Sequence, residues 1–220
     1  GDLMRKLRQD HSDSAKSIAR WTANHFEGIT KATKLGLTAA NGVHTVIGTK
    51  NMRAMTKVAH NLSGQKIPLW TPHLPRPASD VNTLTIRSVG KEKVVYFPSC
   101  ASRNMGTEKN AMDNRPLAEV TISLLEKAGY DVILPEDVNS QCCGMPYKSK
   151  GYVDTANDKM NSLQTALWNA SNDGKYPILM DTSPCASLSK EALQKELAIY
   201  EPFKFVSEFV LPRLSITPQA

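Results

Sequence analysis

In the first quarter of the chain, apolar residues recur at intervals of three and four, which is the spacing of one face of a helix. The pattern predicts a helix starting at Asp13-Ser14, a second over 30–48 that ends at Gly48, and a third over 51–62. We expect the following apolar positions to be buried: Ala15, Ile18, Ala19, Thr22, Phe26, Ile29, Ala32, Leu35, Ala39, Val43, Ile47, Met52, Met55, Val58, Ala59 and Leu62.

Prolines then interrupt the pattern. Pro68, Pro72, Pro75 and Pro77 lie within 64–82. Because proline lacks an N–H donor and disfavours helix before it, this stretch is predicted to be an extended linker after a helical segment over 1–63. We expect the ring of Trp70 to hold the linker against a neighbouring element.

The period changes after residue 82. Short apolar and β-branched runs over 93–98, 131–135 and 176–181 predict three buried strands. Helices are predicted over 116–128, with Leu117, Val120, Thr121, Leu124 and Leu125 on the buried face and Gly129 at the end, and over 153–171 and 189–200. Strands that alternate with helices indicate a parallel sheet with right-handed crossovers, hence a three-layer, Rossmann-like α/β domain over 83–214.

Charge is unevenly distributed along the chain. The net charge is +6 overall, with +8 in residues 1–78 and −2 in the remainder. The basic residues are scattered and no aromatic residues interleave with them, so a nucleic-acid partner is not expected. No apolar run approaches 18 residues and the first twenty residues are polar, so we expect a cytoplasmic protein. A location at the cytoplasmic face of the membrane is compatible with this expectation.

The cysteines follow the predicted strands. Cys100 comes after the first strand, Cys142 and Cys143 after the second, and Cys185 after the third. The number of intervening residues is 41 both between Cys100 and Cys142 and between Cys143 and Cys185. Since ligands of open α/β sheets bind at the carboxyl ends of the strands, we expect all the thiols to meet at one edge.

Several kinds of chemistry suit such a site. Thiolates bind iron–sulfur clusters and zinc, and helix N-termini next to them lower thiol pKa values. Gly144 is expected to let the backbone pass close to an inorganic group. A structural zinc site in an interaction domain and metal-free thiol–disulfide exchange at Cys142-Cys143 stay open as alternatives. All histidines lie in the first 73 residues, so a Ser/His/Asp hydrolase site in the second half is excluded, and no glycine-rich phosphate-binding motif occurs.

Three stretches carry a family resemblance: FPSCASRNMG at 97–106, CCGMPYKSKG at 142–151 and DTSPCASL at 181–188. They resemble the CCG-type cysteine-rich domain of heterodisulfide reductase B subunits and of the glycolate oxidase iron–sulfur subunit. They look most like the branch of FAD-linked, iron–sulfur-containing D-lactate (2-hydroxy acid) dehydrogenases. GDLMRKLR at 1–8 resembles the chain that follows the ferredoxin-like region in that branch.

The resemblance implies an electron-transfer module with an iron–sulfur cluster, such as [4Fe–4S], on Cys100, Cys142, Cys143 and Cys185. It implies that FAD lies elsewhere in the polypeptide, so that the substrate-oxidising residues lie outside this chain. The implied partners are the FAD and ferredoxin-like domains, a second CCG repeat beyond a linker at 215–220, and a quinone or carrier as electron acceptor. Leu188 stands where the family has a further cysteine, which leaves four thiols rather than five.

Arg103, Lys148 and Lys150 lie close to the cysteines in sequence. On this interpretation they supply positive charge that stabilises a reduced cluster.

Overall fold

The computed structural model describes residues 8–9, 11–90, 92–109, 111–192 and 196–215. Its sheet contains β1 (Glu92–Phe97), β2 (Tyr130–Ile133), β3 (Ile178–Met180) and β4 (Ile199–Tyr200) in the order β2-β1-β3-β4. Every neighbouring pair of strands is parallel. The chain moves from β1 outward to β2 and then returns past β1 to β3. Consequently the strand order reverses between β1 and β3, where ligands of such sheets bind.

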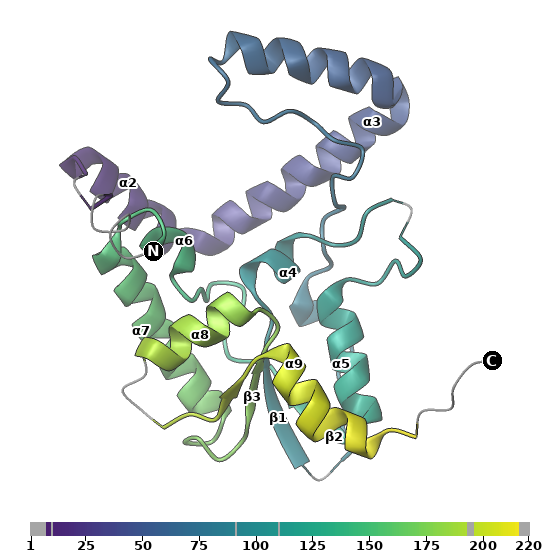
Figure 1. Cartoon of the computed structure of the whole chain (residues 1–220), viewed down its shortest axis with the longest axis vertical. Coiled ribbons are helices and arrows are strands. Elements are labelled where there is room, and N and C mark those ends of the chain that lie inside the picture. Colours follow the sequence, from purple (N-terminus) through teal and green to yellow (C-terminus); the bar gives the residue numbers. More distant parts are fainter. Residues whose placement is uncertain (1–7, 10, 91, 110, 193–195, 216–220) are drawn as a thin grey trace.

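Helices cover both faces of the sheet (Figure 1). On one face lie α5 (Leu117–Lys127) and α9 (Pro202–Phe205), which continues through a π-helical turn at Val206–Val210 and a 3-10 turn at Leu211–Arg213. On the other lie α7 (Val153–Ala170) and α8 (Ser183–Ala192). The predicted α/β class, with a helical N-terminal part before a parallel sheet, is confirmed.

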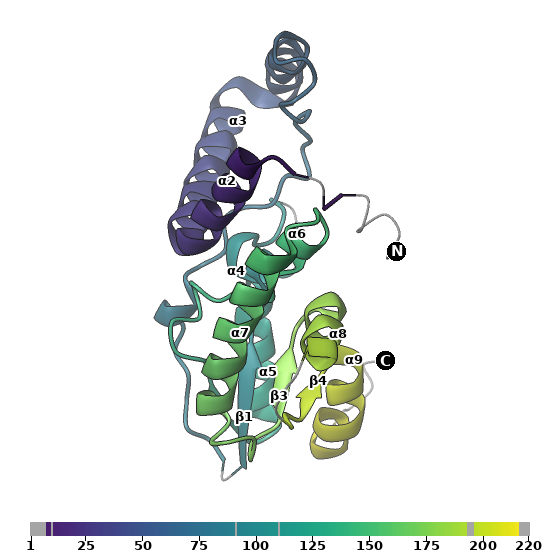
Figure 2. The ribbon, with the colours of Figure 1, turned by 90° about the vertical axis from the view of Figure 1, so that its left-hand side faces the viewer.

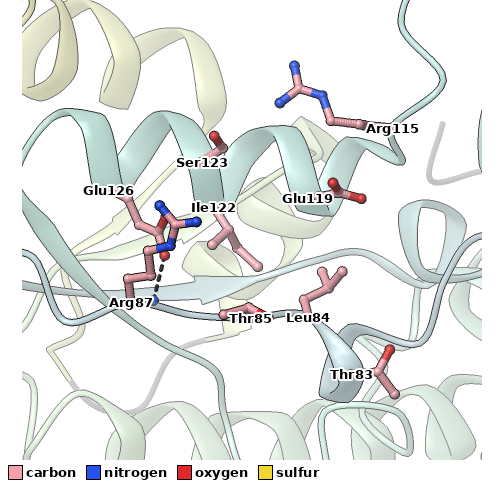
Figure 3. Close-up of a pocket in the computed structure, with 9 residues that line it drawn as sticks. All are labelled: Thr83, Leu84, Thr85, Arg87, Arg115, Glu119, Ile122, Ser123 and Glu126. Atoms are coloured by element: carbon pink, nitrogen blue, oxygen red, sulfur yellow. Dashed lines mark hydrogen bonds between the residues drawn. The ribbon is translucent and has the colours of Figure 1, made fainter.

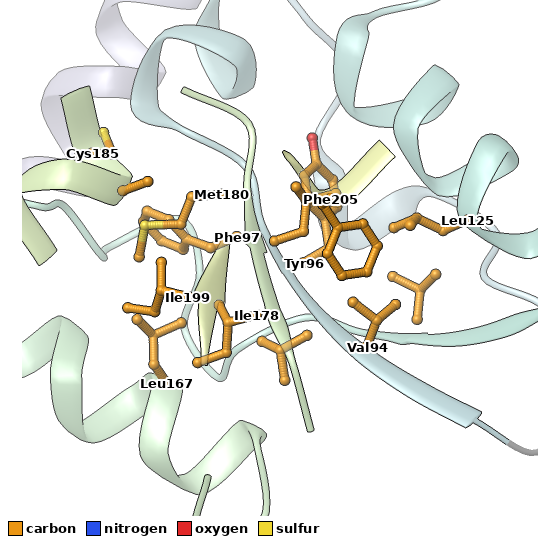
Figure 4. Close-up of a cluster of buried hydrophobic side chains, with 14 of the residues drawn as sticks. Val94, Tyr96, Phe97, Leu125, Leu167, Ile178, Met180, Cys185, Ile199 and Phe205 are labelled. Atoms are coloured by element: carbon orange, nitrogen blue, oxygen red, sulfur yellow. The ribbon is translucent and has the colours of Figure 1, made fainter. Parts of the chain in front are cut away.

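The core forms where these layers meet the sheet. Val94, Val95, Tyr96 and Phe97 of β1 are all buried, as expected for a central strand covered on both faces. Figure 4 shows Leu125 of α5 and Phe205 of α9 on one side of β1, with Leu167 of α7 among Ile178, Met180 and Ile199 on the other.

Two N-terminal helices form a helical arm, α2 (Asp13–Asn24) and α3 (Phe26–Leu62). Ser12 caps α2 by accepting a hydrogen bond from the backbone N–H of Ala15. Gly48 (φ 74°) kinks α3 at the position where the sequence predicted one helix to end. The arm touches the α/β part at its base, where Ala19 and Ala23 pack with Tyr147 and Ala156. The rest of α3 extends away from the sheet (Figure 2).

The predicted buried face of the arm is largely wrong. Ala19, Phe26 and Met52 are buried, whereas Leu35 is 71% and Leu62 84% exposed. Ile18, Met55 and Val58 are more than half exposed, and Val43 is 41% exposed. The physical reason is that α3 extends past the sheet. Within the described part of the chain, no other helix or strand covers most of its apolar face.

The predicted final helix at 189–200 is also wrong. Helix α8 begins earlier, at Ser183-Pro184, where the fixed φ of proline suits a first turn. Ile199 and Tyr200 instead form β4, whose Ile199 pairs with Ile178. In α5 the buried residues are Ala118, Ile122 and Leu125, while Leu117 is half exposed, so the predicted face is shifted around the helix.

The connections carry further detail. Residues 64–80 are irregular, with a 3-10 turn η1 at Val81–Thr83, and the ring of Trp70 lies 4.5 Å from that of His44 on α3. Of the predicted linker at 215–220 only Ser215 lies among the described residues, and most of the motif at 1–8 lies outside them. None of the helices within the described ranges is both long and apolar enough to cross a membrane.

Candidate metal centre

The first cysteine opens a helix directly after β1. Cys100 is the first residue of the short helix α4 (Cys100–Asn104), and Ser99 caps it by accepting a hydrogen bond from the N–H of Ser102. The Ser99 N–H in turn donates to Asp181 Oδ1 at 2.8 Å, just past the end of β3. The turn that holds Cys100 is therefore tied to the strand that precedes Cys185.

The cysteine pair lies in the loop between β2 and the short helix α6 (Met145–Lys148). Gly144 after the pair has φ +80°, and a Cβ at this position would clash with the backbone of Ala156 on α7. Gly144 therefore makes room for a helix of the chain itself, and its expected role beside an inorganic group stays a prediction. Within the structure its close neighbour is α7, and glycine is required both by the left-handed backbone and by this contact.

The fourth cysteine lies in the first turn of α8. Figure 4 shows Cys185 at the rim of the hydrophobic cluster, beyond Met180 at the end of β3. Its Sγ lies 3.0 Å from Sγ of Cys143, well beyond the ~2.05 Å of a disulfide bond. Sulfur contacts continue from Cys143 to Cys142 and from Cys142 to Cys100. All are free thiols, and all except the half-buried Cys100 are buried.

Proximity shifts the pKa values of the thiols in opposite directions. Hydrogen bonds from Cys100 and Cys143 lower the pKa of Cys142, which also accepts from the N–H of Gly144 at 3.4 Å. Hydrogen bonding to Cys142 raises the pKa of Cys100 and of Cys143, and burial adds to both. The hydrogen bond from Cys143 lowers the pKa of Cys185. Among these thiols, therefore, the contacts lower the pKa of Cys142 and Cys185 and raise that of Cys100 and Cys143.

The short distance between two of the sulfurs bears on whether they could share a metal ion as they stand. Among the described residues, no three His, Cys, Asp or Glu side chains are arranged to hold a single metal ion. Tetrahedral zinc with Zn–S bonds of about 2.3 Å would set its sulfurs about 3.8 Å apart. The contact of 3.0 Å between Cys143 and Cys185 is shorter than that. Zinc binding by Cys143 and Cys185 would therefore require these two sulfurs to separate.

A buried guanidinium lies beside the thiols. Arg103 on α4 is 3% exposed, and burial lowers its pKa while the nearby sulfurs of Cys100 and Cys142 raise it. Its Nε donates to the carbonyl of Ser99 at 3.4 Å, and Nη2 donates to the carbonyl of Gln141. Nη1 is buried without a hydrogen-bond partner among the described residues. A buried cation without a carboxylate partner favours an anionic neighbour, which thiolates and thiolate-ligated clusters provide.

A second cation borders the cysteine loop. Lys159 on α7 donates to the carbonyl of Ser140 at 2.9 Å and to that of Ala23 on α2 at 3.3 Å. Burial lowers its pKa, and Cys142 is close enough to oppose that shift. Lys159 therefore ties the helical arm to the residues just before the cysteine pair.

The two other predicted cations face outward. Lys148 lies 3.7 Å from Glu191 in a partly exposed ion pair, and Lys150 is exposed. Of the cations proposed from sequence, Arg103 alone is buried against the sulfurs. Lys159 was not singled out from the sequence, and Asp181 appeared there only as the first residue of the motif at 181–188, because each acts through backbone contacts between segments far apart in the chain.

The structure also contains hollows away from the cysteines. The one in Figure 3 lies between α5 and residues 83–87, where Glu126 accepts a hydrogen bond from the N–H of Arg87 at 2.6 Å. Both acidic and basic side chains line it, and no cysteine does. It is therefore not the centre that the thiols form.

Comparison with known families supports the interpretation of the thiols. Residues 94–187 match the model of the cysteine-rich domain family, CCG. This range begins in β1 and ends in α8, so it contains all the cysteines. The CCG domain is a cysteine-rich module typical of iron–sulfur oxidoreductases, and it suggests iron–sulfur binding in general. No curated protein and no solved structure matches the chain.

Proposed function

We propose that this chain is the iron–sulfur electron-transfer part of a flavin-linked 2-hydroxy acid dehydrogenase of the D-lactate type. The observation that carries the proposal is the convergence of the thiols of Cys100, Cys142, Cys143 and Cys185 beside the buried cation Arg103. The donor set fits an iron–sulfur cluster, because such clusters are held by thiolates.

The roles of the residues follow from their positions. Cys100, Cys142, Cys143 and Cys185 would hold the cluster, which would accept and pass on single electrons. Arg103 and Lys159 place positive charge next to these ligands and so favour the reduced, more negative state. Tyr147 of α6, close to the cysteine pair in sequence, packs with Ala19 and Ala23 of α2, and the side chains of Cys142 and Cys143 are buried.

The finer assignment rests on the sequence resemblance. On this proposal FAD, bound in another part of the polypeptide, oxidises the hydroxy acid, and electrons leave through the thiol-ligated centre to a quinone or carrier. A ferredoxin-like domain and a second CCG repeat are the proposed neighbours. The test is anaerobic addition of D-lactate to the intact natural polypeptide, with bleaching of the visible iron–sulfur absorption expected. A bound flavin that D-lactate leaves oxidised would contradict the assignment.

The iron–sulfur assignment has its own test. We expect protein prepared anaerobically to contain iron and acid-labile sulfide, and Cys142→Ser to lose most of both. Ser187→Ala is the matched control, because Ser187 is an exposed small polar residue two positions after Cys185. Iron content that Cys142→Ser leaves at the level of the control would contradict the proposal.

One contact favours a second function, metal-free thiol–disulfide exchange. The sulfurs of Cys143 and Cys185 are already close enough to need little movement to form a bond. The sequence suggested Cys142-Cys143 for this role, whereas the contact of 3.0 Å joins Cys143 and Cys185, which follow different strands. Thiol counting after mild oxidation separates the functions. Loss of two thiols per chain, equally in protein that never contained iron, would favour exchange.

A further inference from the structure

Two hydrogen bonds connect the residues that immediately precede two of the cysteines. Ser99 precedes Cys100 and Gln141 precedes Cys142, and both carbonyls accept from the single guanidinium of Arg103. These carbonyls belong to loops that follow different strands, β1 and β2. A planar guanidinium with donors in fixed directions holds two such acceptors at a fixed separation.

The carboxylates near Arg103 are already engaged. Asp181 accepts from the hydroxyl of Tyr96 at 3.0 Å and from the N–H of Ser99 at 2.8 Å. Asp80 accepts from Asn139 at 2.8 Å and from the N–H of Asn82 at 3.0 Å. Within the described part of the chain no carboxylate forms an ion pair with Arg103.

The cost of burying this cation therefore needs another explanation. Besides the two carbonyls, the ring of Phe97 faces the guanidinium at 5.5 Å, but none of these groups carries a negative charge, and Nη1 stays unused in a buried setting. The sulfurs of Cys100, Cys142 and Cys185 lie close enough to act on its charge, and the pKa values of Cys142 and Cys185 are lowered. A negatively charged group bound to these sulfurs would compensate the charge and accept the remaining N–H.

We propose that Arg103 is the positioning residue of the centre: it clamps the Cys100 and Cys142 loops to each other and stabilises the charge of the group that their thiolates bind. The second half of this inference rests on the proposed iron–sulfur function, whereas the clamp is independent of it. Arg103 acts through the cysteines and their loops.

Three variants separate the clamp from the charge. Arg103→Gln removes both, Arg103→Lys keeps the charge but loses the forked geometry, and Lys150→Gln removes an exposed charge close to the same loop. Hydrogen exchange of the backbone amides in residues 99–106 and 138–145, measured on metal-free chain, reports the clamp. The midpoint potential of anaerobically prepared chain, from a redox titration followed by electron paramagnetic resonance, reports the charge.

We expect Arg103→Gln to speed exchange at least tenfold in both loops and to make reduction tenfold less favourable, a shift of about 59 mV to more negative potential for one electron. Arg103→Lys should speed exchange to a similar extent but leave the potential near that of the wild type. Lys150→Gln should change neither quantity. If Arg103→Gln fails to fold, the exchange result of Arg103→Lys decides the clamp.

Two results would overturn the proposal. One is amide exchange in the two loops that stays at the wild-type rate in the Arg103 variants, and the other is a midpoint potential that Arg103→Gln does not change. Wild-type chain without iron and sulfide would instead contradict the proposed function. In that case the exchange measurement still decides the clamp, so the two failures are distinguishable.

Discussion

The sheet with its covering helices and the helical arm bury their apolar side chains to very different extents. In β1 every residue from Val94 to Phe97 is buried, and Phe205 and Leu167 pack against opposite faces with no exposed surface. In the 37 residues of α3 only Phe26 and Met52 are buried. The sheet part therefore owes its stability to tertiary packing, whereas most of α3 depends on local helix-forming interactions.

The largest expected difference in the free energy of unfolding is between a substitution in the core and one in the arm. Phe205→Ala should lower the free energy of unfolding by about 3–5 kcal/mol, because it empties a fully buried site beside Tyr130, Tyr200 and Phe209. Leu35→Ala should change it by less than about 0.5 kcal/mol, since Leu35 is exposed. Urea denaturation of both variants measures the difference. Comparable losses would contradict the contrast between the two regions.

Replacing either of two glycines by alanine should change stability by an intermediate amount, with opposite sign in the two variants. Gly144→Ala should destabilise the chain by about 1–3 kcal/mol and reduce iron content. The backbone at residue 144 is left-handed, and a methyl group there would clash with the backbone of Ala156. Gly36→Ala in α3 meets no atom within 4 Å and should stabilise by up to about 1 kcal/mol. Thermal melting of both variants is the measurement. A destabilising Gly36→Ala would indicate that this part of α3 has close neighbours after all.

The smallest expected effect concerns the amino-terminal end of the sheet, away from the thiols. Hydrogen bonds from the N–H of Gly90, the hydroxyl of Ser88 and the N–H of Val89 lower the pKa of Asp131. A lowered carboxyl pKa adds stability above the ordinary value of about 3.9, and this stability is lost as the pH falls through the folded-state value. Asp131→Asn should therefore lower the urea midpoint at pH 7, with the difference from wild type shrinking below pH 4.

The control for that titration is Asp158→Asn, at an exposed position on α7. It should leave the urea midpoint nearly unchanged at pH 7 and below pH 4. A deficit of Asp131→Asn that persists undiminished at pH 2 would show that the effect comes from packing and not from the ionised carboxylate.

The contrast between the regions also explains what the sequence could predict. The central strands and α7 were predicted correctly, because their apolar runs are buried by adjacent elements. Periodicity predicted the helices of the arm but not their exposure, because period alone does not say whether another element covers the face. Strand β4, with Ile199 and Tyr200, is too short to leave a pattern and depends on pairing with β3.

The site was predictable to a similar degree. Strand ends and equal spacing pointed to the four cysteines, since those signals lie in the chain itself. The clamp of Arg103 on Ser99 and Gln141 and the tie of Asp181 to Ser99 depend on how the loops meet. Such contacts between main chain and side chain leave no spacing signal, so only the structure could supply them.

Iron K-edge X-ray absorption of the anaerobically prepared chain tests the central claim most directly. The account predicts iron coordinated by sulfur, with iron–iron scattering from a cluster, and loss of that scattering in Cys142→Ser. Iron bound by oxygen and nitrogen alone, or a sulfur-coordinated spectrum that Cys142→Ser leaves unchanged, would contradict it.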